Sequence, residues 1–118
     1  MSQADNDLRM DYVEFPATDV AATRKFYERA FGWKFEDYGP DYTSFADGRI
    51  AGGFSKERKG TPGKGPLVVL YAVDLERIQS TIKKEGGRIV KGIFSFPGGR
   101  RFHFTDPAGN ELAVLSGK

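Results

Sequence analysis

The amino-acid sequence predicts an α+β fold in which one βαβββ unit occurs twice in tandem. In each half of the chain an apolar strand leads to an aspartate that can cap a helix, and the predicted helix ends at a glycine. Strand-forming segments follow, and the halves close alike: residues 45–48 read Phe-Ala-Asp-Gly and residues 104–107 read Phe-Thr-Asp-Pro. This repeated order of elements indicates an internal duplication.

The first unit begins with a strand over residues 12–15, and its helix is expected between the cap Asp19 and Gly32. The charged residues of this helix lie mostly away from one apolar stripe, the pattern of a helix packed on a sheet. The stripe consists of Ala22, Phe26 and Ala30, with Tyr27 and Phe31 beside it. We expect these aromatic side chains to lie in the core.

The second unit repeats the design with a strand over residues 67–73 and a helix between Asp74 and Gly86. Its inward stripe consists of Leu75, Ile78 and Ile82. The segment 55–65 between the units carries Lys56, Arg58, Lys59 and Lys64 among glycines and prolines. It is interpreted as a linker, because its glycine spacing does not match a phosphate-binding loop and a strand follows it.

Length and composition predict a single domain. We expect a flexible tail over residues 1–9 and a domain over 10–118, with module one at about 10–55 and module two at about 66–117. The absence of cysteine excludes a disulfide framework and a cysteine nucleophile. The formal charge of +2 does not indicate nucleic-acid binding. No apolar run approaches the roughly 20 residues of a membrane helix, so we expect a cytoplasmic protein.

Two segments carry a resemblance to a known family. Residues 26–33 read FYERAFGW and residues 104–115 read FTDPAGNELAVL. Together with the order of elements, they resemble the vicinal-oxygen-chelate superfamily of glyoxalase, bleomycin-resistance and extradiol-dioxygenase proteins. Residues 51–54, Ala-Gly-Gly-Phe, make the chain most similar to the uncharacterised glyoxalase-like branch. The resemblance implies that the two modules form a curved mixed sheet around a cup, with the helices outside.

The resemblance also implies a divalent metal held by His, Glu or Gln, a prediction that the sequence does not support. The corresponding positions are about Tyr12, Gly52, Val68 and Ala113, and none of these is a plausible ligand. Shifting the alignment by one residue recovers no site, because the neighbours of Gly52, Val68 and Ala113 have no donor atoms either. A site built from Glu14, His103 and Glu111 would need a geometry that the family does not use. We therefore expect neither a metal nor another cofactor.

Strand alternation gives the expected lining of the cup. The residues in register with the lost ligands are Tyr12, Glu14, Val68, Leu70, Ala113 and either Glu111 or Leu115. The opposite faces, with Val13, Phe15, Val69, Tyr71, Val73, Leu112 and Val114, are expected to pack under the helices. Arg101 and His103 lie opposite Phe102 and Phe104, so they could converge with Tyr12 and Glu14 in the cup.

Each polar or aromatic candidate also has a structural interpretation. Trp33 could stack on a ligand with Tyr42 or Phe45, or it could pack at the edge of its module. Arg101 could oppose Glu14 or Glu111 across strands, and His103 could be a partly exposed surface residue. The segment 106–110, Asp-Pro-Ala-Gly-Asn, is interpreted as a turn and not as a binding motif.

Two functions follow from the resemblance. The first is a metal-free protein that captures a small aromatic or amphipathic molecule in the cup, as the bleomycin-resistance branch does. The alternative is a glyoxalase-like lyase or isomerase, or a dioxygenase, that uses His103, Glu14 and Tyr12 as acid and base groups. Open sheet edges predict a homodimer. The sequence leaves open whether one chain or two chains form each cup.

Overall fold

The structure, a computed structural model, describes residues 3–58, 60–61 and 63–117. The elements of module one are β1 (Tyr12–Pro16), α1 (Val20–Phe31), β2 (Lys34–Asp37), β3 (Tyr42–Ala46) and β4 (Ala51–Ser55). Those of module two are β5 (Val68–Tyr71), α2 (Leu75–Lys84), β6 (Arg88–Phe96), β7 (Gly99–Thr105) and β8 (Glu111–Ser116). The predicted α+β fold with tandem βαβββ modules is confirmed.

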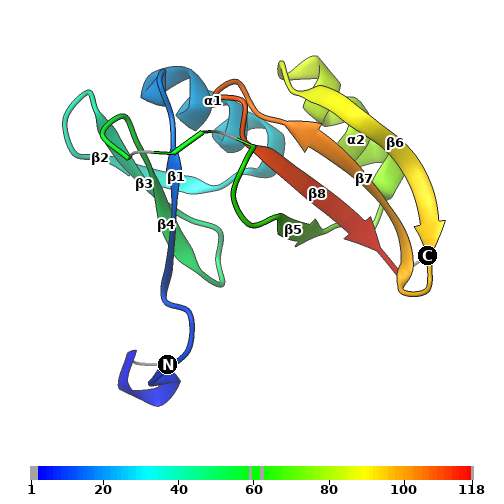
Figure 1. The fold of residues 1–118 in the computed structure, drawn as a ribbon, viewed down its shortest axis with the longest axis horizontal. Helices are drawn as coiled ribbons and strands as arrows, with labels where there is room; N and C mark the ends of the chain where they lie inside the picture. The colour runs from blue at the N-terminus through cyan, green and yellow to red at the C-terminus, as the bar shows by residue number, and fades with distance from the viewer. Residues whose placement is uncertain (1–2, 59, 62, 118) are drawn as a thin grey trace.

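The remaining segments lie outside the two modules. A short 3-10 helix, Gln3–Asn6, precedes β1 and lies apart from the rest of the molecule in Figure 1. The expected linker is described except for residues 59 and 62, which, like residues 1, 2 and 118, fall outside the described part. No helix in that part is long and apolar enough to cross a membrane.

Each module forms its own four-stranded mixed sheet. The strand orders are β1-β4-β3-β2 and β5-β8-β7-β6, so the two sheets have the same topology. In each sheet the first and last strands of the module pair in parallel, and the other pairs are antiparallel. Among the described residues, β1 and β5 each pair with one strand and lie at the edges of their sheets.

The helix ends are fixed by the residues that the sequence indicates. Asp19 accepts a hydrogen bond from the Ala22 amide at 3.0 Å, and Asp74 accepts one from the Arg77 amide at 3.0 Å. Helix α1 ends at Gly32, whose φ of 73° is left-handed. These local signals start both helices at the correct residue and orient their apolar stripes.

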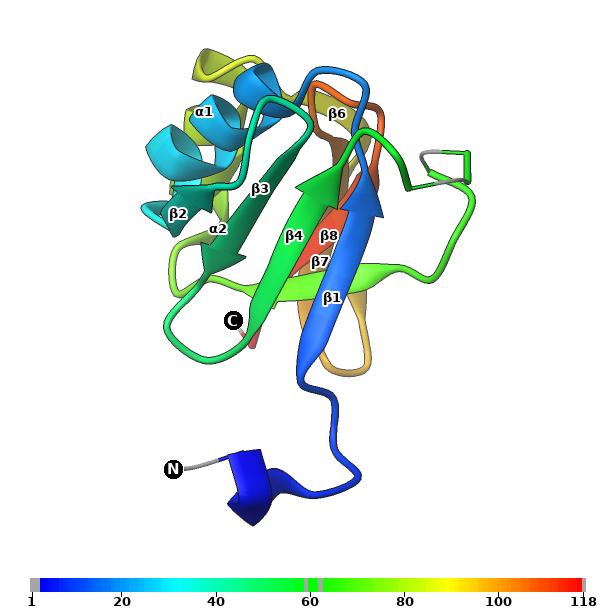
Figure 2. The same ribbon diagram turned by 90° about the vertical axis from the view of Figure 1, so that its left-hand side faces the viewer.

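Both helices contribute to one core that lies between the two sheets. The rings of Phe26 and Phe31 in α1 lie 6.0 Å from that of Phe104 in β7, while Tyr27 stacks on Phe54 of β4 at 4.9 Å. Each sheet therefore turns one face to the shared core and its other face, the free face, away from it. Figure 1 shows β6–β8 in front of α2, and Figure 2 shows β1, β4 and β3 in front of module two.

A buried polar network also joins the modules. Asp106, in the turn after β7, accepts hydrogen bonds from the hydroxyl of Tyr27 in α1 at 2.9 Å and from Asn110 Nδ2 at 3.2 Å. Its other oxygen accepts from the backbone amides of Ala108 and Asn110, both at 2.9 Å. Asn110 Nδ2 also donates to the Pro16 carbonyl at 2.8 Å. Segment 106–110 is the predicted turn, and its two polar side chains additionally fasten module two to module one.

The expected face assignment of β5 is wrong. Val68 and Leu70 pack against the core, whereas Val69 and Tyr71 are 38% and 65% exposed. The register explains this, because Val68 pairs with a buried leucine of β8 and Leu70 with a buried valine. Counting back from the helix caps predicts the same faces. Tyr12 lies seven residues before Asp19, and the position seven residues before Asp74 is 67, so Val69 and Tyr71 correspond to the free face of β1. Val73, also expected under the helices, is exposed as well.

Irregularities in β6 interrupt the regular alternation of its side chains between the two faces of the sheet. Ile89 pairs with Phe104, Lys91 with His103, and Phe94 with Arg101, so the register shifts twice within the strand. Such bulges place an extra residue opposite a single partner. As a result, Lys91 and Phe94 share the free face although they are three residues apart.

Candidate functional site

The free face of module one contains a hydrogen-bonded group of two tyrosines and a glutamate. The Tyr42 hydroxyl donates to Glu14 Oε2 at 3.0 Å and also hydrogen bonds to the Tyr12 hydroxyl. The Tyr12 hydroxyl lies 3.3 Å from Ser44 Oγ, which in turn donates to the Gly52 carbonyl at 3.1 Å. Strands β1 and β3 lie on either side of β4, so their side chains meet above it.

A glycine in β4 makes room for this group. Gly53 pairs with Glu14 in the sheet, and a Cβ at this position would overlap with the hydroxyls of Tyr42 and Tyr12. Burial raises the pKa of Tyr42 above its usual value, and its hydrogen bonds to Tyr12 and Glu14 raise it further. Tyr42 is therefore a protonated donor at neutral pH. The arrangement can bind polar groups of a ligand.

The free face of module two carries a histidine–glutamate pair. His103 Nδ1 lies 2.8 Å from Glu111 Oε2, and the residue is only 8% exposed. In the neutral imidazole, the carboxylate accepts the Nδ1 proton, and Nε2 then keeps its lone pair. The imidazole also stacks on Phe94, with ring centroids 6.0 Å apart. Ala113 pairs with His103 in the sheet and is fully covered.

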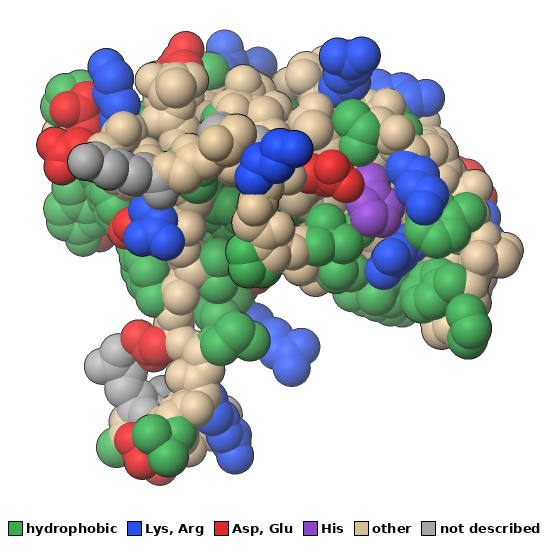
Figure 3. Space-filling view, in the orientation of Figure 1, with side chains coloured by type: hydrophobic (Ala, Val, Ile, Leu, Met, Phe, Trp, Pro, Cys, Tyr) green, Lys and Arg blue, Asp and Glu red, His purple; other side chains and the backbone are tan. Residues whose placement is uncertain are grey.

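Basic side chains lie on the aromatic rings beside this pair. The Arg101 guanidinium is 5.4 Å from the ring centroid of Phe94 and 5.3 Å from that of Phe96. Lys91 Nζ lies 4.3 Å from the centroid of the Phe94 ring. Figure 3 shows the histidine between an acidic side chain and basic side chains, with hydrophobic side chains below. This face is therefore aromatic and mostly cationic.

The two polar groups do not meet within one chain. Tyr12 and Glu14 lie on the free face of the first sheet, whereas Arg101 and His103 lie on that of the second, and the shared core separates the two faces. Across strands β7 and β8, Glu111 pairs with His103 and not, as expected, with Arg101.

The expected role of Trp33 as a ligand-stacking residue is not supported by its position. Its ring stacks on Tyr27 at 4.8 Å and on Phe45 at 4.6 Å, and both partners are buried in the core. The structural alternative, packing at the edge of the module, therefore applies. Tyr42, its expected stacking partner, lies on the opposite face of β3 from Phe45.

The residues present do not fit the divalent metal that the resemblance implies. Gly52 faces the core, because a Cβ there would meet the Val13 carbonyl and the ring of Phe45. Glycine and valine occupy the corresponding free-face positions of β4 and β5, namely Gly53 and Val69. In the described part of the chain, no three His, Asp or Glu side chains are grouped closely enough to hold a metal ion.

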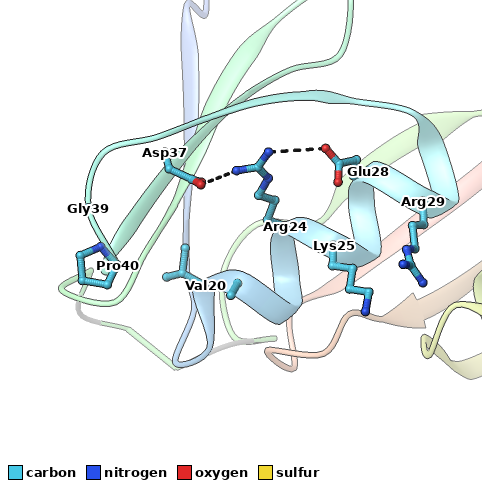
Figure 4. Close-up of a pocket in the computed structure, with 9 residues that line it drawn as sticks. Val20, Arg24, Lys25, Glu28, Arg29, Asp37, Gly39 and Pro40 are labelled. Atoms are coloured by element: carbon cyan, nitrogen blue, oxygen red, sulfur yellow. Dashed lines mark hydrogen bonds and ion pairs between the residues drawn. The ribbon is translucent and has the colours of Figure 1, made fainter.

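A surface hollow of the described chain lies elsewhere, on the outer side of α1 (Figure 4). Arg24 crosses it and pairs with Asp37 and, at 3.6 Å, with Glu28. The Thr43 hydrogen bond and the neighbouring Arg24 lower the pKa of Asp37. The charges of Arg24, Asp37 and Glu28 therefore compensate one another at the exposed surface.

Sequence reasoning missed several residues of the two free faces. Ser44 follows Tyr42 by two positions, so alternation along β3 would have found it. Phe94, Phe96 and Lys91 could not be placed, because the bulges of β6 leave no trace in the alternation.

Comparisons with known proteins agree with the fold. The family model described as Glyoxalase/Bleomycin resistance protein/Dioxygenase superfamily matches residues 9–114. A glyoxylase-like domain-containing protein of Didymella fabae is 26% identical over 119 residues, covering 90% of this chain and 93% of that protein. A glyoxalase-related enzyme from Fulvimarina pelagi superposes with a TM-score of 0.80 at 13% identity, covering 92% of this chain and 88% of its own. Lactoylglutathione lyase from Agrobacterium tumefaciens superposes with a TM-score of 0.72 at 17% identity, covering 93% of this chain and 94% of its own.

Proposed function

Because this chain belongs to the Glyoxalase/Bleomycin resistance protein/Dioxygenase superfamily, we propose that it is a metal-independent member that binds a small aromatic or amphipathic molecule. One observation carries the proposal. The free faces have no metal donors at the expected positions, yet they keep organised polar groups beside partly exposed aromatic side chains. Such a combination, apolar surface with a few placed polar groups, is typical of ligand sites.

We further propose that the binding cup forms between two copies of the chain. The free faces of one chain point away from their shared core, so they cannot enclose a ligand together. The edge strands β1 and β5 each have one side without a partner strand in the described chain, and Val69, Tyr71 and Val73 are exposed there. In a homodimer, the first sheet of one copy can oppose the second sheet of its partner.

Complementation between damaged subunits tests the shared cup. Glu14→Ala damages one half of the cup and His103→Ala the other half. If two chains form each cup, a mixed dimer of these variants has one intact cup and should bind a fluorescent aromatic probe at half the wild-type stoichiometry. The proposal would be contradicted if the mixed dimer did not bind the probe. A monomeric mass by light scattering at tens of micromolar protein would contradict it as well.

Metal titration tests the other part of the proposal. Elemental analysis after incubation with Ni, Zn, Mn and Fe(II), with thermal unfolding alongside, should show no stoichiometric ion and no rise in melting temperature. A tightly bound ion with a shifted melting temperature would instead support metal-dependent chemistry at a donor set other than the one the family uses.

Acid–base catalysis is a second candidate function, favoured by one specific observation. Glu111 orients the imidazole of His103 in the manner of a general base, with Nε2 left as the acceptor. A glyoxalase-like lyase or isomerase activity, or a dioxygenase activity, would use this base or the group of Tyr12 and Glu14. If so, turnover of an α-hydroxycarbonyl substrate should fall at least about 100-fold in His103→Ala.

A further inference from the structure

The free face of module two contains two buried polar nitrogens without a hydrogen-bond partner in the described chain, Arg101 Nε and His103 Nε2. Their residues are two apart on β7, so both side chains leave the same face, with Cα atoms about 7 Å apart. Buried polar groups are nearly always paired, and an unpaired one lowers stability. Two such atoms on neighbouring side chains are candidate contacts for a ligand.

We propose that this face binds the polar head of a planar hydroxy acid, an aromatic carboxylate that also carries a hydroxyl group. The carboxylate accepts from Arg101, the hydroxyl donates to His103, and the ring packs against Phe94. This inference rests on the proposed small-molecule function and names the ligand class for one half of the cup.

The requirement for a hydroxyl comes from the histidine. In the neutral imidazole, Glu111 accepts the Nδ1 proton across 2.8 Å, so the buried Nε2 presents a lone pair and needs a donor. Within the described chain no side chain supplies that donor. A ligand carboxylate alone cannot satisfy it, because an ionised carboxylate only accepts hydrogen bonds.

The requirement for an acid comes from the arginine. The Nε–H of Arg101 is a donor that needs an acceptor, and a charged acceptor gives the stronger bond. Two cations, Arg101 and Lys91, lie over the Phe94 ring, and one carboxylate, Glu111, lies on the same face. The balance of charge therefore favours an anion.

The requirement for a planar ligand comes from the aromatic side chains. The ring centroid of Phe94 lies 6.0 Å from that of the His103 imidazole and 5.4 Å from Cζ of the Arg101 guanidinium. Both side chains that carry an unpaired nitrogen therefore lie beside one aromatic ring. A ring attached to the carboxylate can stack there, whereas inorganic phosphate or acetate could use only the polar atoms.

Calorimetry with three matched probes tests the inference: 3-hydroxybenzoate, benzoate without the hydroxyl, and 3-hydroxybenzamide without the charge. We expect 3-hydroxybenzoate to bind at least about tenfold more tightly than either control compound. Arg101→Gln should abolish the preference for the carboxylate, and His103→Phe the preference for the hydroxyl. Arg100→Gln is the matched control, because this neighbour faces the other side of β7, pairs with Glu76, and should change neither preference.

Two further readouts keep the outcome clear. Circular dichroism and thermal unfolding must show that each variant is folded; if His103→Phe is not, His103→Gln replaces it, and its hydroxyl preference should persist in part. Equal binding of the neutral and acidic probes, mapped by NMR shifts to the free faces, would overturn the hydroxy-acid class and leave the proposed function intact. Absence of binding for every aromatic probe in the dimer would overturn both.

Discussion

Replacing Tyr27 with phenylalanine tests how strongly the buried network joins the two modules. The Tyr27 hydroxyl donates to Asp106 Oδ2 at 2.9 Å, and the other donor to this oxygen is Asn110 Nδ2 at 3.2 Å. Phenylalanine keeps the ring and its stacking on Phe54, so no cavity forms. The loss is one hydrogen bond to a buried carboxylate, and we expect the free energy of unfolding to fall by about 2 kcal/mol near neutral pH.

The pH dependence gives this prediction a second, independent readout. Burial raises the pKa of Asp106, and the Tyr27 hydrogen bond opposes that rise. The raised pKa means that the folded state binds a proton more readily than the unfolded state. The stability contribution of Asp106 therefore falls as the pH increases from the pKa of the unfolded state through the raised pKa of the folded state. Tyr27→Phe raises the pKa further. Its cost should therefore be larger at about pH 7 than at about pH 4, where the carboxyl approaches its protonated form.

Urea denaturation followed by circular dichroism, at both pH values, measures the two costs. Tyr38→Phe is the matched control, because this tyrosine is 61% exposed and should change stability by less than about 0.5 kcal/mol. A cost for Tyr27→Phe below about 0.5 kcal/mol at both pH values, or an equal cost at both, would refute the reasoning.

Neighbouring glycines should respond differently to alanine. Gly52→Ala directs a methyl group at the backbone of β1 and at a core ring, so urea denaturation should show a loss above about 2 kcal/mol. Gly53→Ala displaces only the ends of two tyrosine side chains, so it should cost less and chiefly weaken probe binding; equal losses of stability would contradict the face assignment. Asp19→Ala removes the cap of α1 and should cost about 1 kcal/mol by the same assay, and a neutral result would mean that the cap is dispensable. Because burial and then hydrogen bonds to Tyr12 and Glu14 raise the pKa of Tyr42, Glu14→Gln should lower that pKa in an ultraviolet titration; an unchanged titration would argue against the hydrogen bond.

Local sequence signals predict most of the fold. The caps Asp19 and Asp74 begin the two helices and the left-handed Gly32 ends the first, so signals within a few residues of each helix reveal its bounds. The apolar stripes of the helices likewise identify Phe26 and Ile82 as core residues. Such features depend on the periodicity of one element and not on its partners.

The site was harder to predict because it depends on how the elements pair. The side of β5 that faces the core is set by its register with β8, and a count that differs by one residue reverses it. The bulges of β6 likewise bring Phe94 beside Arg101 without any sequence mark. Asp106 has the composition of an ordinary turn residue, and only the packing of α1 against module two reveals its partner Tyr27.

The shared core has a consequence for how the chain folds. Since α1 packs on both sheets, neither half of the duplicated sequence can bury its apolar face alone. The protein should therefore unfold in a single cooperative transition, although its sequence looks like two independent repeats. For the same reason, a chain cut in the segment between Ser55 and Val68 should yield two fragments that are disordered separately and that fold on mixing.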